Sequence, residues 1–107
     1  MVNRFMRIIV MFDLPIKSEK EKREYINFRK FLLRDGYDML QFSIYSRLCP
    51  NSDAVDAHLD RLKKASPPKG AVRVITITNK QFSDAKILTG KRSYQEKKIK
   101  KEQLVLL

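Results

Sequence analysis

The sequence is poor in residues that form covalent or metal cross-links. Cys49 is the one cysteine and His58 the one histidine among 107 residues. A lone cysteine excludes a disulfide within the chain, and these two residues cannot supply the four ligands of a structural zinc site. His58 sits among typical surface residues with no nucleophile at a suggestive spacing, so we assign it no catalytic role. A chain of this length is one domain whose stability must come from an apolar core.

Long apolar runs are also missing. Arg4, Arg7 and Asp13 interrupt the apolar N-terminal stretch, which is too short to span a bilayer and does not resemble a signal peptide. We therefore expect a cytoplasmic protein that has no membrane partner.

Acidic residues are scarce relative to basic ones. The chain has 12 Asp and Glu against 23 Lys and Arg, which gives a formal net charge of +11. A surplus of this size on a small domain favours a polyanionic partner, because each phosphate that the protein neutralises releases counterions. A ribosomal role or an anionic membrane surface would fit the charge alone equally well. The charge predicts the class of partner and nothing finer.

The most apolar stretch, residues 5–15, reads as a strand that ends at Pro15. Alternation places Arg7, Ile9, Met11 and Asp13 on one side and only apolar residues on the other. A face that is half apolar and half charged is expected to contact a partner, with Asp13 at its rim. Asp13 has a second interpretation as a simple turn-opening residue, and these residues alone favour that one.

The remaining elements follow from capping, periodicity and breakers. Ser18 and Glu21 have the spacing of a capping box, so a helix is predicted from about residue 19 to Gly36. Residues 37–49 are too long for one strand and predict two strands or one bend, although no Gly, Pro or Asn-Gly pair marks the corner. The further expectations are a helix over 53–65 and a strand over 71–78. A short turn or a single helical turn is expected over 79–84, with 85–88 extended after it.

One face of the first helix carries a basic row. Its members recur at helical spacing and are Lys20, Arg23, Asn27, Lys30 and Arg34. Such a row can follow a phosphate backbone, but it is equally well explained as a solvated face partly neutralised by neighbouring glutamates.

The C-terminal residues differ from the rest of the chain. Residues 91–102 are a basic arm, and residues 103–107, QLVLL, are strongly apolar. We divide the chain into a domain over 1–90 and an arm with an edge strand over 91–107. Leu104, Val105 and Leu106 are expected to add to the edge of a sheet, either their own or that of a second subunit.

The order of elements predicts an α+β fold of the ferredoxin-like βαββαβ type. Its antiparallel sheet would carry two helices on one face and an extra C-terminal edge strand. A two-fold homodimer, with Ile9 and Met11 in the interface, is the simplest way to cover the other face.

Several segments together resemble a known family. They are Met11 to Pro15, the helix with Tyr25, Phe28 and residues 29–33, the segment QFSIY over 41–45 and TNKQF over 78–82. In this order and spacing they resemble the small CRISPR adaptation protein, in the form found beside the large single-effector nuclease.

The resemblance implies a homodimer that exchanges its C-terminal strand. It also implies that the dimer binds duplex DNA and bridges two CRISPR integrase dimers while new spacers are integrated. By position, the phosphate contacts fall to Lys17 and Lys20, and by extension to Arg23, Lys30 and Arg34.

The resemblance also implies an alternative activity. Family members are described as Mg²⁺-dependent endonucleases of single-stranded RNA or double-stranded DNA. Asp13 is the matching catalytic and metal-binding residue, and one ion would be shared with the Asp13 of a second subunit. One carboxylate per chain is a sparse metal site, and facing carboxylates can instead hold a cation that relieves their repulsion. A third interpretation, an RNA-recognition module of the same strand order, is disfavoured because the strand over 71–78 has no stacking aromatic.

Overall fold

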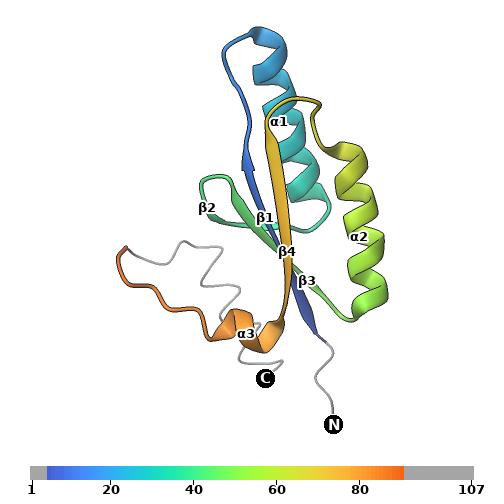
Figure 1. Ribbon diagram of the computed structural model, residues 1–107, viewed down its shortest axis with the longest axis vertical. Helices are drawn as coiled ribbons and strands as arrows, with labels where there is room; N and C mark the ends of the chain where they lie inside the picture. The colour runs from blue at the N-terminus through green and yellow to red at the C-terminus, as the bar shows by residue number, and fades with distance from the viewer. Residues whose placement is uncertain (1–4, 91–107) are drawn as a thin grey trace.

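The structure is a computed structural model, and it describes residues 5–90. Four antiparallel strands form one sheet in the order β2-β3-β1-β4 (Figure 1). The elements are β1 (Met6–Asp13), α1 (Glu19–Arg34), β2 (Asp38–Gln41), β3 (Ile44–Cys49), α2 (Ser52–Ala65), β4 (Ala71–Thr78) and α3 (Asn79–Ser83). The predicted α+β, ferredoxin-like arrangement is confirmed.

The core lies between the sheet and the two long helices. The alternate β1 residues Ile8, Val10 and Phe12 point to this side. They pack against Phe28 and Leu32 of α1 and against Val55 and Leu62 of α2. The Phe12 ring meets the Phe28 ring edge-on at 5.2 Å and stacks on the Tyr45 ring at 5.7 Å. Burying each such side chain stabilises the fold by about 1.5–3 kcal/mol, so the apolar face of β1 anchors both helices.

Local chemistry fixes where α1 begins. The Ser18 hydroxyl accepts a hydrogen bond from the Glu21 amide at 3.1 Å, and the Glu21 carboxylate accepts one from the Ser18 amide at 3.0 Å. The predicted capping box is therefore confirmed. Gly36 follows the helix at φ +90°, a conformation that a side chain would strain.

The corner that sequence rules left open falls at Phe42 and Ser43. These two residues connect β2 to β3, and Ser43 has φ +63°. Gly or Asn ordinarily fills such a position. The Ser43 carbonyl accepts a hydrogen bond from the Phe12 amide of β1 at 3.0 Å, so a contact distant in sequence holds the turn.

Arg7 corrects one expectation. We expected it on an open face that meets a partner, but it is only 1% exposed. Its Nε donates to the Asn79 side chain at 3.1 Å, and its guanidinium lies 4.9 Å from the centre of the Phe82 ring. Asn79 and Phe82 belong to α3, which therefore covers this end of the sheet's second face.

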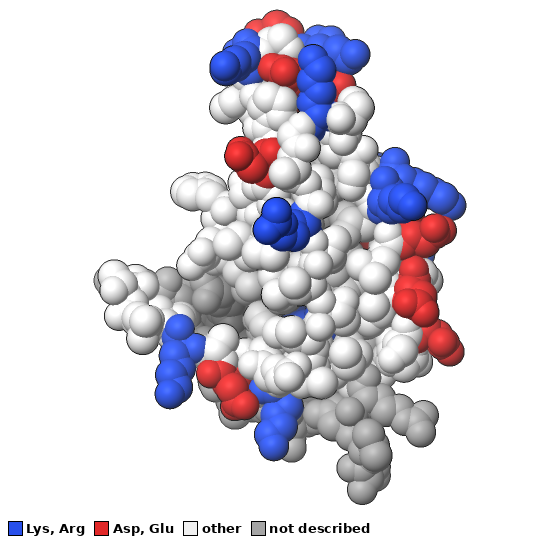
Figure 2. Space-filling model, viewed as in Figure 1, with Lys and Arg blue, Asp and Glu red and all other residues white. Residues whose placement is uncertain are grey.

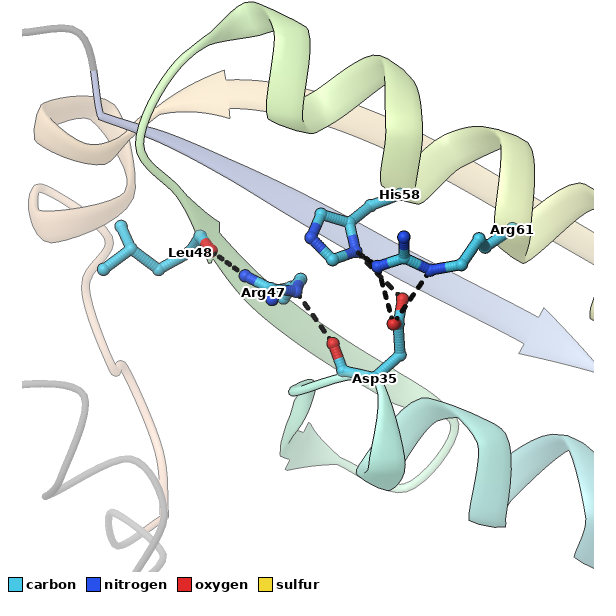
Figure 3. Close-up of polar contacts among 5 residues, drawn as sticks. All are labelled: Asp35, Arg47, Leu48, His58 and Arg61. Carbon is cyan, nitrogen blue, oxygen red and sulfur yellow. Dashed lines mark hydrogen bonds and ion pairs between the residues drawn. The ribbon is translucent and has the colours of Figure 1, made fainter.

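His58 is not the surface residue that its neighbours suggested. It is buried on α2, and its Nδ1 lies 2.9 Å from the Asp35 carboxylate at the end of α1 (Figure 3). Arg61 donates two hydrogen bonds to the same carboxylate, at 2.8 and 3.1 Å. Arg47 of β3 donates to the Asp35 and Leu48 backbone carbonyls. Burial opposes ionisation of Asp35, but the bonds from His58 and Arg61 hold the pKa of that carboxyl below its usual value. The cluster joins α1, β3 and α2 and has a structural role.

The β4 edge of the sheet has no neighbouring strand within residues 5–90. Leu104, Val105 and Leu106 and the basic arm over 91–102 lie outside the described residues, so their pairing stays a prediction. In the part of the chain that the structure describes, no helix is both long and apolar enough to cross a membrane.

Candidate functional site

Asp13 is the last residue of β1 and its side chain is exposed, as the sequence predicted. On one side Asp13 pairs with Ala71 of β4, and Gly70 comes so close that an added Cβ would lie 2.6 Å from the Asp13 carbonyl oxygen. On the other side the turn between β2 and β3 is bonded to Phe12. Two neighbouring segments therefore position the backbone of Asp13.

Among the described residues, Asp13 is not part of a cluster of metal ligands. Within residues 5–90 no three His, Cys, Asp or Glu side chains group where they could hold a metal ion. Mg²⁺ requires near-octahedral oxygen coordination, and protein sites commonly supply one or two carboxylates besides water and substrate phosphates. Asp13 is one carboxylate, the lower end of that range, and the described residues add no three-ligand group to it. A shared site would need the Asp13 of a second subunit.

The basic row on α1 is present in space as the helical spacing predicted. Lys20, Arg23, Lys30 and Arg34 are all exposed. Among the described residues none of these four forms an ion pair, whereas Lys22 is paired with Glu19 at 3.4 Å. The far end of the row surrounds a shallow hollow lined by Asn27, Lys30, Leu33 and Arg34. These cations are therefore available to an anionic partner.

Lys69 lies near the start of α1 and is a further cation that the sequence analysis did not identify. Lys17 is exposed just before the helix, and Lys69 arrives from the loop between α2 and β4. Backbone hydrogen bonds from Ser18 and Lys17, with the nearby charge of Lys69, hold the pKa of Glu21 below its usual value. Figure 2 shows basic and acidic side chains mixed at this end of the molecule. Because Lys69 is far away in sequence, no spacing rule links it to Lys17.

The outer surface of α2 has the opposite charge over much of its length. Asp53, Asp56 and Asp60 are exposed there, and Lys64 is bonded to Asp60 at 3.2 Å. Acidic side chains form a row at the right of the view in Figure 2. The first half of α2 is therefore unfavourable for a polyanion, whereas Lys63 and Lys64 make its last turn basic.

Within residues 5–90, α3 lies against the Arg7 end of the sheet's second face. Directly opposed residues of neighbouring strands share a face, so Ile75 of β4 lies beside Ile9, and Arg73 lies beside Met11. Ile75 is 48% exposed and Ile9 is 8% exposed. The surface over β4 in Figure 2 is largely uncharged. Arg73 is an exposed cation near the Asp13 end that sequence analysis did not single out.

Comparison with known proteins decides the family. The sequence profile described as CRISPR associated protein Cas2 matches residues 6–85, which include all four strands and both long helices. The chain belongs to the Cas2 family. The resemblance to a small CRISPR adaptation protein is thereby confirmed.

Individual members of the Cas2 family agree over most of the chain. A CRISPR-associated endoribonuclease Cas2 of Acidovorax ebreus (strain TPSY) is 48% identical over 101 residues, which cover 94% of this chain and 99% of that protein. The protein of the same description from Streptococcus mutans serotype c (strain ATCC 700610 / UA159) is 46% identical over 87 residues, 81% of this chain and 80% of its own. That of Campylobacter jejuni subsp. jejuni serotype O:2 is 42% identical over 95 residues, 89% of this chain and 66% of its own.

Proposed function

We propose that this member of the Cas2 family is a CRISPR adaptation subunit that binds duplex DNA as a homodimer and bridges integrase dimers during spacer integration. The observation that carries the proposal is the exposed row of unpaired cations on α1. From Lys20 to Arg34 the row spans about 21 Å at 1.5 Å per residue, which is long enough to reach several phosphates. Lys17 and Lys69 extend it past the start of the helix.

The homodimer is supported by the second face and by the open edge of the sheet. A second copy packed on the second face of the sheet would bury the exposed Ile75 side chain. At the β4 edge, Val72 and Val74 line a groove against Leu59 and Leu62 of α2. An added strand with apolar side chains fits this groove, and we propose that Leu104, Val105 and Leu106 of the partner supply it.

Two variants that differ in how much of the C-terminus they alter test the dimer. A chain that ends at Gly90 lacks both the arm and the apolar terminus, whereas a Leu104→Asp, Leu106→Asp variant keeps the arm. Light scattering should give twice the chain mass for the wild type and the single-chain mass for both variants. A dimeric mass for both variants would contradict strand exchange.

Charge reversal tests the DNA contacts. The variant Lys17→Glu, Lys20→Glu should weaken duplex binding for all sequences alike and reduce the slope of log K against log salt by up to about 0.9 for each phosphate that the variant no longer neutralises. The matched control, Lys80→Glu, Lys86→Glu, makes the same change in net charge at two exposed lysines outside α1. Equally weakened binding in both variants would mean that net charge alone, and not the α1 surface, governs binding.

A reconstituted integration assay tests the role itself. The cognate integrase is supplied with duplex DNA and either no added chain, the wild type or Asp13→Ala, once the variant is shown to dimerise. Integration should require the wild type and should proceed equally with Asp13→Ala, because a scaffold needs no catalytic carboxylate. If integration proceeds without the chain, the proposal is wrong.

A second candidate function is a metal-dependent endonuclease acting through Asp13. It is favoured by the exposed carboxylate at the end of β1 and by relatives that are described as endoribonucleases. True cleavage of RNA or DNA should disappear with EDTA and with Asp13→Ala in equal measure. Cleavage that survives in Asp13→Ala would exclude this site as its source.

A further inference from the structure

The second half of α1 presents an apolar and basic patch to solvent. The shallow hollow lined by Asn27, Lys30, Leu33 and Arg34 lies there, and Ile26, one turn before Lys30, is 48% exposed. We call these five residues the α1 patch. The second half of α1 contains no Asp or Glu to neutralise its cations. A phosphate backbone is attracted to Lys30 and Arg34 but gains nothing from exposed apolar side chains, so the patch as a whole suits a protein surface.

The first half of α2 presents a complementary surface. Asp53, Asp56 and Asp60 are exposed, and the exposed Ala57 lies between them. We call these four residues the α2 row. Among the described residues neither Asp53 nor Asp56 forms an ion pair. A side chain as small as that of Ala57 lets a second helix approach closely, so the row offers negative charge around a place where an apolar side chain can pack.

The two surfaces also match in spacing. Lys30 and Arg34 are four residues apart, as are Asp56 and Asp60, so both pairs are spread over about 6 Å of helix axis. In an aligned contact of the two helices, both cations therefore reach a carboxylate. Figure 1 shows α1 and α2 covering the same face of the sheet. Within one chain, however, no ion pair of the described residues joins the patch to the row, so their charges are left for a different molecule.

We propose that the α1 patch binds the α2 row of a second copy, in a head-to-tail contact separate from the homodimer contact through the sheet. The apolar members of the patch pack around Ala57, while Lys30 and Arg34 pair with Asp56 and Asp60. Exposed ion pairs contribute little individually and are screened by salt, so the contact is weak and salt-sensitive. A head-to-tail contact does not close on itself, so it joins homodimers into larger assemblies.

The contact competes with the proposed DNA surface for the same cations. Lys30 and Arg34 are the far end of the basic row on α1, whereas Lys17 and Lys20 at its start remain uncovered. A polyanion that releases its counterions at Lys30 and Arg34 therefore displaces the second copy. Only this competition rests on the proposed function, because the contact itself needs no nucleic acid.

Charge-swapped variants test the contact. One variant, Lys30→Glu, Arg34→Glu, makes the α1 patch acidic, and the other, Asp56→Lys, Asp60→Lys, makes the α2 row basic. Sedimentation velocity of the full chain should show species larger than the homodimer for the wild type in about 50 mM NaCl, and their loss in about 500 mM NaCl. Each variant alone should lack these species in low salt, because like charges then face each other. An equimolar mixture of the variants should regain them, and since both variants keep a positive net charge, attraction between whole chains does not explain the recovery.

A matched control and a cross-link locate the contact. Lys80→Glu, Lys86→Glu makes the same change in net charge as the acidic α1 variant and should associate like the wild type. A carbodiimide joins only amines and carboxylates that are in direct contact, so it should link Lys30 to Asp56 or Asp60 of another chain. Excess duplex DNA should suppress this link.

Three outcomes would overturn the inference. They are a wild-type mass that does not change with salt, no recovery of the larger species in the mixture, or the same loss of association in the control variant as in the acidic α1 variant. If self-association is absent while duplex binding is normal, the inference fails and the proposed function stands. If the cross-link forms but no duplex binds, the contact stands and the proposed DNA-binding function fails. A link that persists unchanged in saturating duplex would refute the competition.

Discussion

Replacing Gly70 by alanine should damage the Asp13 end of the sheet more than its local conformation alone explains. Gly70 has φ +91°, and a Cβ there would lie 2.6 Å from the Asp13 carbonyl oxygen and 3.0 Å from both the Leu14 and Pro15 side chains. Backbone and a proline ring cannot swing aside as a long side chain does. The end of β1 must therefore move if Gly70 gains a side chain.

The size of the effect follows from a matched pair of glycines. Gly36 has nearly the same φ, +90°, but a Cβ there would meet only the Arg47 guanidinium, at an ordinary 3.4 Å. The left-handed conformation costs alanine about 1–2 kcal/mol at either position. Forced overpacking adds about 1–3 kcal/mol at Gly70 alone. The entropy that alanine removes from the unfolded chain, worth about 0.4–1 kcal/mol, offsets both substitutions alike.

Urea unfolding of the two variants measures the difference, and we expect Gly70→Ala to lose about 1–3 kcal/mol more than Gly36→Ala. Any Asp13-dependent activity should fall in Gly70→Ala and persist in Gly36→Ala under conditions where both are folded. Equal free energies of unfolding for the two variants would refute the idea that the contact with Asp13 constrains this position.

Three further predictions concern the interior. Asp35→Asn should lower the free energy of unfolding at pH 7 by about 1.5–3 kcal/mol, the range for hydrogen bonds to charged groups. The pKa of Asp35 is lower in the folded than in the unfolded state. This contribution to stability is therefore present above the unfolded pKa of about 3.9 and is lost as the pH falls through the lower folded pKa. In urea titrations at pH 3, the difference in the free energy of unfolding between Asp35→Asn and the wild type should therefore be smaller than at pH 7. Cys49 is fully buried and burial raises the pKa of its thiol, so a thiol reagent should label it only as fast as the protein opens, and immediate labelling of the native protein would contradict this. Tyr45→Phe should cost about 1 kcal/mol in thermal or urea unfolding, because Arg29 Nε donates to the Tyr45 hydroxyl at 3.0 Å, and an unchanged stability would mean that this bond contributes nothing.

Regular elements were predictable where local chemistry determines them. The capping box at Ser18 and the alternation of Ala71–Thr78 gave the start of α1 and the whole of β4. The second long helix begins at Ser52, one residue before the predicted start, because Asn51 caps it by accepting from the Ala54 amide. Such signals lie within a few residues of one another, so a single sequence reveals them.

Features that depend on distant partners were not predictable. The corner at Ser43 is held by Phe12, and no local turn residue marks it. The sequence alone suggests that Arg7 is a surface charge, because its hydrogen-bond partner Asn79 is 72 residues away. His58 likewise forms a hydrogen bond with Asp35, which is 23 residues away in the sequence. Charge and polarity in a sequence predict exposure, but a folded chain can bury a polar group wherever another element satisfies it.

The candidate site divides in the same way. The position of Asp13 at the end of a strand and the cations on one face of α1 follow from periodicity. The topology of the sheet brings Gly70 to Asp13 and Lys69 to Glu21, and it also fixes the corner at Phe42 and Ser43. Whether two copies of Asp13 meet is a question about the assembly and stays a prediction.

The order of the strands has a consequence for synthesis on the ribosome. The first strand to be translated, β1, lies inside the folded sheet between β3 and β4. From Asp13 to Thr78 the ribosome adds 65 residues, which takes about 3–13 s at about 5–20 residues per second. Until β3 is made, β1 lacks both of its neighbours, and until β4 is made it still lacks one. The nascent chain therefore exposes an aggregation-prone segment early, and it must be protected until the last strand of the sheet emerges.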